Sequence, residues 1–421
     1  MTDKILELFF QEERWTRAIA KGYDKDIRKD QLYQLTKPEI RAQIYAAMKA
    51  GKYIIAPPHT AKIPKDKPGE FRTVYINEPI DRIVISIAND LFFELMPELI
   101  HPSCKSYQKG IGCGKVVKEV SRTVVNTPGD IIGWKSDLSK YFDSVPLRYI
   151  DEVFDRIDAK YGKSALTDTI RAYYHSDYFF DENNTLRQSY QSLKQGCAVA
   201  AFLANTILYD IDEKLSSLNG FYVRYSDDMY FAGQDKDKAM EILVSSLEEK
   251  EMKLNPKKVE RLSKDRWFKF LGYSIKGDKI SLSASRIKTF QKEIEKRTIR
   301  NRKTTPTKAL NAVNRYLYKG NGEHSWASQI LPVCNVKEDI DTLNAFVMDA
   351  LRAVATGKTK IGGLGYVSGG EGGCIARGTG RNVSANLAKT DKEIRGYLTL
   401  GCMRNALITD REAYNALVLS I

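Results

Sequence analysis

The stretch that decides the fold runs from Phe221 to Gly233 and reads FYVRYSDDMYFAG. Two apolar segments flank the acidic turn Ser226-Asp227-Asp228, so we expect two short strands joined in a tight hairpin. Adjacent Asp residues are also common in ordinary exposed turns, because Asp tolerates turn conformations. A hairpin that packs on a sheet rarely places two charges between buried strands, because burying a charge is costly. The pair is therefore predicted to serve a functional site.

A third acid is predicted to meet this hairpin. Residues 130–136 are apolar and β-branched, and they predict a strand that ends at Asp137. If this strand neighbours the hairpin, three carboxylates converge and repel one another unless cations lie among them. Carboxylate oxygens without His or Cys are typical ligands of Mg²⁺ or Mn²⁺. Two such ions stabilise the attacking and leaving oxygens of phosphoryl transfer, which is the chemistry of polymerases.

The composition of the whole chain fits a folded protein that binds a polyanion. Its 421 residues suggest two or three domains, and 43% apolar with 28% charged residues argues against disordered, collagen-like and coiled-coil classes. Lys and Arg exceed Asp and Glu by 13, which favours nucleic acid as the partner. The Cys residues lack metal-binding spacing and are interpreted as free thiols. We find no signal peptide and no membrane-spanning stretch, so a cytoplasmic location is expected.

Strands mixed with helices up to about residue 280 predict an α+β fold. Residues 63–76 predict a basic hairpin, and residues 80–96 and 196–215 predict buried helices. Beyond residue 280 the pattern is mostly helical, and residues 286–303 carry eight Lys or Arg against two Glu. Ten glycines follow in residues 356–381, which suit a flexible linker or a surface that approaches RNA closely.

The order of these motifs resembles the bacterial reverse transcriptases, which include group II intron, retron, diversity-generating, abortive-infection and defence-associated enzymes. Tyr225-Ser226-Asp227-Asp228 is similar to the YxDD catalytic hairpin of that family, and residues 137–146, DLSKYFDSVP, are similar to its first catalytic strand end. The resemblance covers roughly residues 55–280. It implies a right-hand polymerase with fingers, an α+β palm built on a ferredoxin-like antiparallel sheet, and a helical thumb.

The resemblance also implies a division of the chain and a set of site residues. The division is N-terminal helices and fingers at 1–130, palm at 131–280 with fingers-contributing helices at about 147–190, helical thumb at 281–355 and a Gly-rich C-terminal extension at 356–421. The catalytic residues would be Asp137, Asp227 and Asp228, which with Leu138 would also hold two Mg²⁺ ions, or Mn²⁺. The nucleotide-binding residues would be Lys65, Arg72, Phe142, Gln195, Gly196 and Lys258. The primer grip would be Phe270, Leu271, Gly272 and Tyr273. The RNA-binding residues on the thumb helix would be Arg286, Lys288, Lys292, Lys296, Arg297, Arg300, Arg302 and Lys303.

Physical reasons accompany the nucleotide-binding roles. Lys65 and Arg72 would neutralise the β- and γ-phosphates as charge develops, and Lys258 would neutralise the departing pyrophosphate. Phe142 follows Asp137 by five residues, where its ring would overlap a 2′-hydroxyl and so select deoxynucleotides. The alternatives are a core position for Phe142 and a solvent-exposed position for Lys65 and Lys258.

The chain also departs from the family pattern. The Ser-Pro that usually follows Gln-Gly is replaced by Cys197-Ala198, which changes how the template strand would be held. Residues 281–421 contain no His/Cys cluster of the HNH endonuclease type, so a mobile-intron enzyme is not expected. We also find no retron-type signature. These departures favour a defence-associated lineage that works with a dedicated non-coding RNA.

We therefore expect Mg²⁺-dependent synthesis of DNA on an RNA template, from a primer 3′-hydroxyl, in bacterial anti-phage defence. The expected partners are the RNA template, the DNA primer and product, and deoxynucleoside triphosphates. The first alternative is template-independent or protein-primed DNA synthesis of the abortive-infection type. The second is an RNA-binding scaffold without catalysis. The third is an RNA-dependent RNA polymerase, against which the aromatic ring of Phe142 argues.

Overall fold

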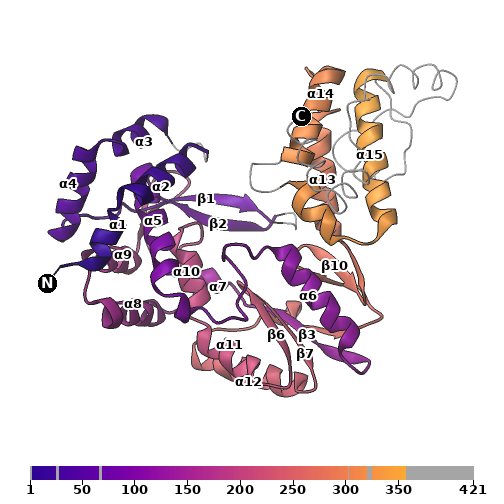
Figure 1. The fold of residues 1–421 in the computed structure, drawn as a ribbon, viewed down its shortest axis with the longest axis horizontal. Helices are drawn as coiled ribbons and strands as arrows, with labels where there is room; N and C mark the ends of the chain where they lie inside the picture. The colour runs from indigo at the N-terminus through magenta and orange to yellow at the C-terminus, as the bar shows by residue number, and fades with distance from the viewer. Residues whose placement is uncertain (1, 25–27, 66–68, 302, 320–324, 357–421) are drawn as a thin grey trace. The chain divides into compact units, whose positions relative to one another are not determined.

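The structure is a computed structural model, and it describes residues 2–24, 28–65, 69–301, 303–319 and 325–356. Its described part falls into two compact units (Figure 1). Unit 1 consists of the described residues within Met1–Ile111 and Ile131–Leu262, and unit 2 consists of the described residues within Gly112–Asp130 and Ser263–Ile421. The predicted Gly-rich extension lies outside the described residues, apart from Thr356 at its start. Among the described residues, no helix has the length and apolar composition needed to cross a membrane.

Unit 1 begins with helices whose first turns are stabilised by local sequence. The Asp3 side chain accepts a hydrogen bond from the Leu6 N–H at the start of the first helix, and Pro38 and Pro79 occupy the first turns of two others. The elements are α1 (Lys4–Phe9), α2 (Glu12–Asp24), α3 (Lys29–Leu35), α4 (Pro38–Lys49), α5 (Pro79–Leu95) and the short helix η1 (Pro97–Leu99). The predicted buried helix 80–96 is α5, which contacts α1, α2 and α3.

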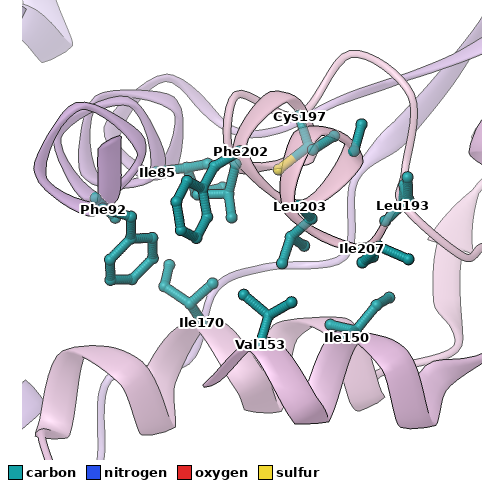
Figure 2. Close-up of a cluster of buried hydrophobic side chains, with 14 of the residues drawn as sticks. Ile85, Phe92, Ile150, Val153, Ile170, Leu193, Cys197, Phe202, Leu203 and Ile207 are labelled. Atoms are coloured by element: carbon teal, nitrogen blue, oxygen red, sulfur yellow. The ribbon is translucent and has the colours of Figure 1, made fainter. Parts of the chain in front are cut away.

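The main core of unit 1 lies between α5 and three later helices. These are α8 (Leu147–Tyr161), α9 (Ala165–His175) and α10 (Val199–Thr206). Figure 2 shows Phe92 of α5, Val153 of α8, Ile170 of α9 and Phe202 of α10 in one buried cluster. The rings of Phe92 and Phe202 lie 5.7 Å apart. These side chains are fully buried or nearly so, and their removal from water is the main stabilising term for this unit.

The single helix predicted over 196–215 is wrong, because the chain forms two helices there. Helix α10 ends at Thr206, Leu208 leaves the helical region with φ −100° and ψ 11°, and α11 (Tyr209–Ser216) begins directly after it. No Gly or Pro marks this break in the sequence. The corner lets α11 pack against both the following strand and α12 (Lys236–Glu249), so tertiary packing decides the break.

The sheet that carries the acids has four strands in the order β6-β7-β3-β8. The strands are β3 (Ile131–Asp137), β6 (Gly220–Tyr225), β7 (Asp228–Gly233) and β8 (Glu260–Ser263). The hairpin and the strand ending at Asp137 are therefore where the sequence predicts them. Gly133 is needed in β3, because a Cβ at this position would lie 2.0 Å from the Phe231 carbonyl oxygen of β7. The Trp134 and Phe231 rings stack beside it, 5.9 Å apart.

A second sheet of unit 1 contains the basic hairpin, in the order β2-β1-β4-β5. Its strands are β1 (His59–Pro64), β2 (Phe71–Ile76), β4 (Tyr178–Phe180) and β5 (Leu186–Gln188). The predicted hairpin over 63–76 forms, but it starts four residues earlier, at His59. His59 pairs with Phe180, and their rings stack 4.8 Å apart. This stacking explains why the strand extends beyond the stretch that the sequence pattern indicates.

Unit 2 combines one helix from the middle of the chain with the segments that follow residue 262. Its elements are α6 (Cys113–Asn126), β9 (Phe268–Phe270), β10 (Tyr273–Lys276), β11 (Lys279–Leu282), α13 (Ala284–Arg297), α14 (Pro306–Asn314), η3 (Arg315–Lys319), η4 (Trp326–Ile330), η5 (Leu331–Val333) and α15 (Lys337–Thr356). The apolar face of α6 packs on β10 and β11, whereas the sequence-based division placed residues 112–130 with the N-terminal part. That division into fingers, palm, thumb and extension stays a prediction.

The basic helix predicted over 286–303 is shorter than expected. Helix α13 ends at Arg297, because Thr298 leaves the helical region with φ −118° and ψ −103°. Arg300 and Lys303 therefore lie beyond the helix, and Arg302 lies outside the described residues. The fold class is α+β, as predicted, and the β1–β2, β3–β7 and β6–β7 pairs are antiparallel, whereas β1 and β4 pair in parallel.

Candidate active site

The three predicted acids lie at one end of the β6-β7-β3 strands. Asp137 is the last residue of β3 and stands opposite Asp228, the first residue of β7, in the antiparallel register. Asp227 lies in the turn between β6 and β7, and its carbonyl oxygen accepts a hydrogen bond of 3.3 Å from the Leu138 N–H. The β3–β7 pairing therefore forces the three acids together.

Burial and mutual repulsion set the protonation of these acids. Burial, together with the nearby negative charges of Asp227 and Asp137, raises the pKa of Asp228 to about 7. Burial also raises the pKa of Asp227, again with a contribution from Asp137. Keeping all of these carboxylates ionised near neutral pH therefore requires positive charge at the site.

The donor chemistry of the site fits a hard divalent cation. It offers carboxylate oxygens, and Leu138, whose side chain is a hydrocarbon, has only its backbone carbonyl to offer a metal. Among the described residues, however, no three Asp, Glu, His or Cys side chains form a group that encloses a metal position. The acids are neighbours at the strand ends, so it is the chemistry of their oxygens that suits a cation.

The lysine predicted to meet the pyrophosphate lies on one of the acids. Lys258 belongs to the short helix η2 (Pro256–Lys258), and its Nζ lies 2.6 Å from Asp137 Oδ2. The same segment is held to β3, because the Asn255 N–H donates to the Asp137 carbonyl oxygen at 2.9 Å. Lys258 thus supplies the positive charge that Asp137 needs, and its predicted role toward pyrophosphate stays a prediction.

The basic hairpin brings its charges within electrostatic reach of the acids. Lys65 and Arg72 are both exposed, and the Lys65 N–H donates to the Glu70 carbonyl oxygen at 2.9 Å, which closes the hairpin. The positive charge of Arg72 acts against burial on the pKa of Asp227 and partly lowers it. Arg72 is therefore near enough to act on an anion that binds beside Asp227.

The loop that precedes α10 holds Gln195 and Gly196 against this hairpin. The Tyr75 N–H donates to the Gln195 carbonyl oxygen at 2.7 Å. Gly196 has φ +105°, and a Cβ there would lie 2.9 Å from the Tyr75 carbonyl oxygen, so only glycine suits this position. The predicted Gln-Gly element therefore has a structural reason in this close backbone approach.

A buried lysine that the sequence did not reveal fixes the same loop. Lys194 is 1% exposed, and its Nζ donates to the carbonyl oxygens of Tyr173 at 2.6 Å and Ser176 at 2.8 Å. Burial lowers its pKa to about 8. The ammonium also lies 4.1 Å from the centre of the Tyr173 ring. It thereby anchors Gln195 to the end of α9.

Phe142 lies on α7 (Tyr141–Ser144), directly after the turn that follows Asp137. The turn depends on Lys140, which has φ +51°. Phe142 is half-buried and packs on the core, with its ring 5.6 Å from that of Tyr141. Its carbonyl oxygen accepts a hydrogen bond of 3.1 Å from the Leu193 N–H. The ring is thus partly accessible, and its role toward the sugar stays a prediction.

The predicted primer grip forms the tight turn between β9 and β10 in unit 2. Leu271 and Gly272 both have positive φ, +48° and +79°. Arg286 donates to the Leu271 carbonyl oxygen at 3.3 Å, and its guanidinium lies 4.4 Å from the centre of the Tyr273 ring. Arg286 was predicted to bind RNA, and in this structure it supports the turn.

The remaining basic residues of α13 and its C-terminal flank divide into two groups. Arg297 pairs with Glu293 and lies 4.1 Å from the centre of the Tyr316 ring, and Arg300 pairs with Glu295 at 2.7 Å. The exposed lysines on the helix follow one another at intervals of four residues, so they lie along one face: Lys288, Lys292 and Lys296. This lysine stripe is the part of the predicted RNA-binding set on the helix that remains available to a phosphate backbone, and Lys303 is exposed beyond the helix end.

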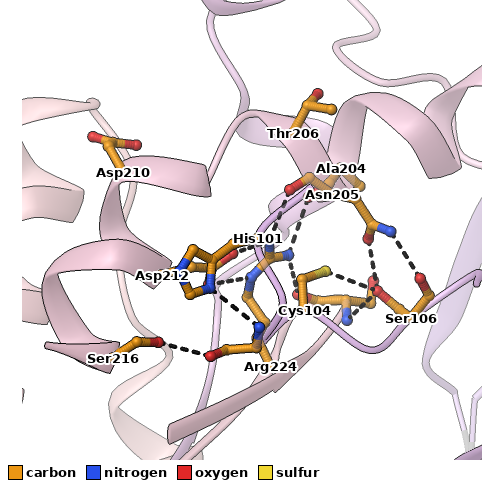
Figure 3. Close-up of polar contacts among 12 residues, drawn as sticks. His101, Cys104, Ser106, Ala204, Asn205, Thr206, Asp210, Asp212, Ser216 and Arg224 are labelled. Carbon is orange, nitrogen blue, oxygen red and sulfur yellow. Dashed lines mark hydrogen bonds and ion pairs between the residues drawn. The ribbon is translucent and has the colours of Figure 1, made fainter. Parts of the chain in front are cut away.

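Sequence reasoning also missed a buried polar cluster behind the acidic turn. Arg224 of β6 and Asp212 of α11 form a salt bridge of 2.5 Å, and both side chains are fully buried (Figure 3). The available signal was an arginine in the middle of the otherwise apolar strand FYVRY. A charge at a buried strand position indicates a partner, but the sequence does not say which acid provides it.

Comparisons with known proteins bear on this site. The family model described as reverse transcriptase (RNA-dependent DNA polymerase) matches residues 63–275, slightly more than half of the chain. No curated protein sequence matches the chain. Among solved structures, apo telomerase from Candida tropicalis is similar with a TM-score of 0.45 and 12% identity, and the match covers 72% of this chain and 58% of the telomerase chain.

The raised pKa of Asp228 predicts how stability depends on pH. In the unfolded chain an Asp ionises near pH 4, whereas Asp228 in the fold keeps its proton up to about pH 7. The folded state binds the extra proton between these values, so stability falls as the pH rises through this window. Asp228→Asn removes this pH-dependent loss of stability, because Asn carries no ionisable proton. With EDTA present, its gain in unfolding free energy should be about 2–3 kcal/mol larger at pH 8 than at pH 5.

Denaturant melts of the wild type and the variant at both pH values measure this difference. Asp130→Asn, which changes an exposed acid just before β3, is the matched control and should show no such dependence. Equal gains for Asp228→Asn at pH 5 and pH 8 would contradict the prediction.

The lysine stripe predicts a change in the salt dependence of RNA binding. Replacing Lys288, Lys292 and Lys296 by Gln removes up to three phosphate contacts, and each lost contact reduces the log-log salt slope by roughly 0.7 to 0.9. The control changes the same net charge on exposed lysines of unit 1: Lys37, Lys49 and Lys52. Titrations of a fluorescent RNA duplex at several salt concentrations measure both slopes, and identical slopes for the two triple variants would contradict the assignment.

Proposed function

This chain belongs to the reverse transcriptase family, and from that membership we propose that it is an RNA-directed DNA polymerase. The observation that carries the proposal is the convergence of Asp137, Asp227 and Asp228 at the strand ends, where burial and repulsion keep the pKa of Asp228 near 7. Clustered acids that are buried or half-buried cost a fold stability, because burial and mutual repulsion both oppose their ionisation. Such a cluster is useful where cations and a triphosphate bind.

The residues of the site have separate roles in nucleotide transfer. The carboxylates of Asp137, Asp227 and Asp228, with the Leu138 carbonyl oxygen, would hold two divalent ions, for which we propose Mg²⁺. These ions supply charge neutralisation at the attacking and leaving oxygens. The protein positions the primer 3′-hydroxyl and the deoxynucleoside triphosphate so that the reacting atoms are in line.

The basic residues around the acids serve the triphosphate. Arg72 and Lys65 project from the hairpin toward the β- and γ-phosphates, and fixed positive charge there stabilises the developing negative charge. Lys258 lies beside Asp137 and is close enough to the site to neutralise pyrophosphate as it departs. Phe142 lies under the incoming sugar in this proposal and excludes a 2′-hydroxyl.

We also propose a biological setting, which rests on the resemblance of the sequence to the defence-associated enzymes. In this setting the chain copies a dedicated non-coding RNA in the bacterial cytoplasm during anti-phage defence. Sequencing of the RNA and DNA that copurify with the chain tests the setting directly. One enriched RNA together with DNA complementary to it supports the setting, and DNA without any RNA complement favours template-independent synthesis.

The polymerase proposal predicts the activity of acid variants. With Mg²⁺, a DNA primer on an RNA template and deoxynucleotides, the wild type should extend the primer, and Asp227→Asn should reduce the rate by at least ~100-fold. Asp130→Asn is the control and should extend normally. Extension by Asp227→Asn at the wild-type rate would reject the site. Wild-type synthesis that does not depend on the RNA would support the template-independent alternative.

Sugar selection gives a separate prediction. Phe142→Val should raise ribonucleotide incorporation relative to deoxynucleotide incorporation at least ~10-fold, because the smaller side chain leaves room for the 2′-hydroxyl. If Phe142 only packs on the core, the change would instead leave a cavity and lower stability by about 1–3 kcal/mol without altering sugar choice. Single-nucleotide incorporation and thermal unfolding, measured together, distinguish these outcomes. A wild type that already prefers ribonucleotides would contradict the assignment.

A further inference from the structure

The residue before the two adjacent acids is held in a strained conformation. Ser226 has φ +60°, a left-handed value that is uncommon for residues other than glycine. Such a conformation persists only where the surroundings determine it strongly. Both polar groups of the Ser226 backbone are in fact held by buried side chains. Its N–H donates to Ser106 Oγ at 2.9 Å, and its carbonyl oxygen accepts from Arg224 Nη1 at 3.2 Å.

Arg224 is itself fixed through all of its donors. A guanidinium has five N–H groups, and those of Arg224 account for five hydrogen bonds (Figure 3). Two reach the Asp212 carboxylate at 2.7 and 2.5 Å. Three reach the carbonyl oxygens of Ala204 at 3.2 Å, Asn205 at 2.8 Å and Ser226 at 3.2 Å. The guanidinium therefore has one orientation, and Ser226 receives its hydrogen bond from a fixed direction.

Ser106 is fixed in a comparable way. Its hydroxyl donates to Asn205 Oδ1 at 2.7 Å, and the Asn205 amide donates back to the Ser106 carbonyl oxygen at 2.7 Å. This donation leaves the lone pairs of the hydroxyl to accept from the Ser226 N–H. Both side chains are completely buried, so water does not compete for these bonds.

The buried cluster of Arg224, Asp212, Ser106 and Asn205 contains more polar groups than the stability of the fold requires. Buried ion pairs contribute little net stability, because the loss of hydration offsets their attraction. Apolar side chains would join α10, α11 and β6 equally well, but they would not hold the N–H and the carbonyl of Ser226. We propose that Arg224 and Ser106 are positioning residues that fix the Ser226 turn and thereby keep Asp227 and Asp228 beside Asp137. The proposal rests on the proposed function for the use of these acids, but it concerns their geometry.

Loss of either contact has a defined consequence. The strained turn is then free to relax toward negative φ, which rotates the backbone that carries Asp227. Repulsion among the acids favours any relaxation that separates them. The first property to weaken is therefore the binding of a divalent cation, before any effect on RNA or nucleotide binding.

The experiment measures Mn²⁺ binding to the full chain by electron paramagnetic resonance, without substrates. Ser106→Ala removes the acceptor of the Ser226 N–H, and Arg224→Lys removes the donor to its carbonyl oxygen. Each should weaken Mn²⁺ binding at least fivefold and lower kcat at least tenfold, with KM for the deoxynucleotide within twofold. The control is Ser103→Ala, which removes a hydroxyl of the same segment that bonds Ser216 at 2.7 Å and leaves Ser226 untouched.

Asn205→Ala provides a second route, because it removes the partner that orients Ser106 without changing either group that touches Ser226. It should weaken Mn²⁺ binding in the same direction. The proposal is overturned if folded Ser106→Ala and Asn205→Ala bind Mn²⁺ as the wild type does. It is also overturned if binding is lost only in proportion to the fraction unfolded in thermal melts. A wild type that extends no primer, with Mn²⁺ binding still weakened in Ser106→Ala, would reject the polymerase function and support the positioning role.

Discussion

Repulsion among Asp137, Asp227 and Asp228 is the constraint on which the design of unit 1 depends. The antiparallel register places Asp137 opposite Asp228, and the tight turn adds Asp227 beside them. Several parts of the fold counteract the resulting strain: Lys258 neutralises Asp137, Arg72 acts on Asp227, and Arg224 holds the turn from behind. The rigid four-stranded sheet keeps the acids together although their charges favour separation.

The parts of the fold that local sequence determines were predictable. The apolar segments on both sides of Asp227-Asp228 predict the hairpin, and the apolar run before Asp137 predicts the neighbouring strand, because a short apolar run bounded by a turn depends only on nearby residues. The break between α10 and α11 was not predictable, since it depends on packing against α12. The end of α13 at Arg297 was also missed. The basic residues continue beyond Arg297 and suggested a longer helix, but the backbone leaves the helical conformation at Thr298.

The site residues were predictable where the residue types alone indicate the ligand that they bind. Three acids without His or Cys indicate a hard cation, and Asp137 and the Asp pair were found this way. Arg224, Ser106 and Lys194 were missed, because their roles come from partners that are not neighbours in the sequence: Asn205, for example, lies 99 positions after its partner Ser106. Two of the basic residues predicted to bind RNA have other contacts in the structure: Arg286 supports the turn at Leu271, and Arg297 lies over the Tyr316 ring. The composition of the segment alone does not reveal these contacts.

The course of the chain between the two units has a consequence for synthesis on the ribosome. Helix α6 lies between segments of unit 1 in the sequence, but its partners β10, β11 and η5 all follow residue 262. Its apolar face, with Val116, Val120 and Val124, is therefore made long before anything can cover it. At about 5–20 residues per second, more than 130 further residues require several seconds or more of translation. During that interval a nascent chain exposes the apolar face of α6, which a chaperone that binds apolar surface can shield.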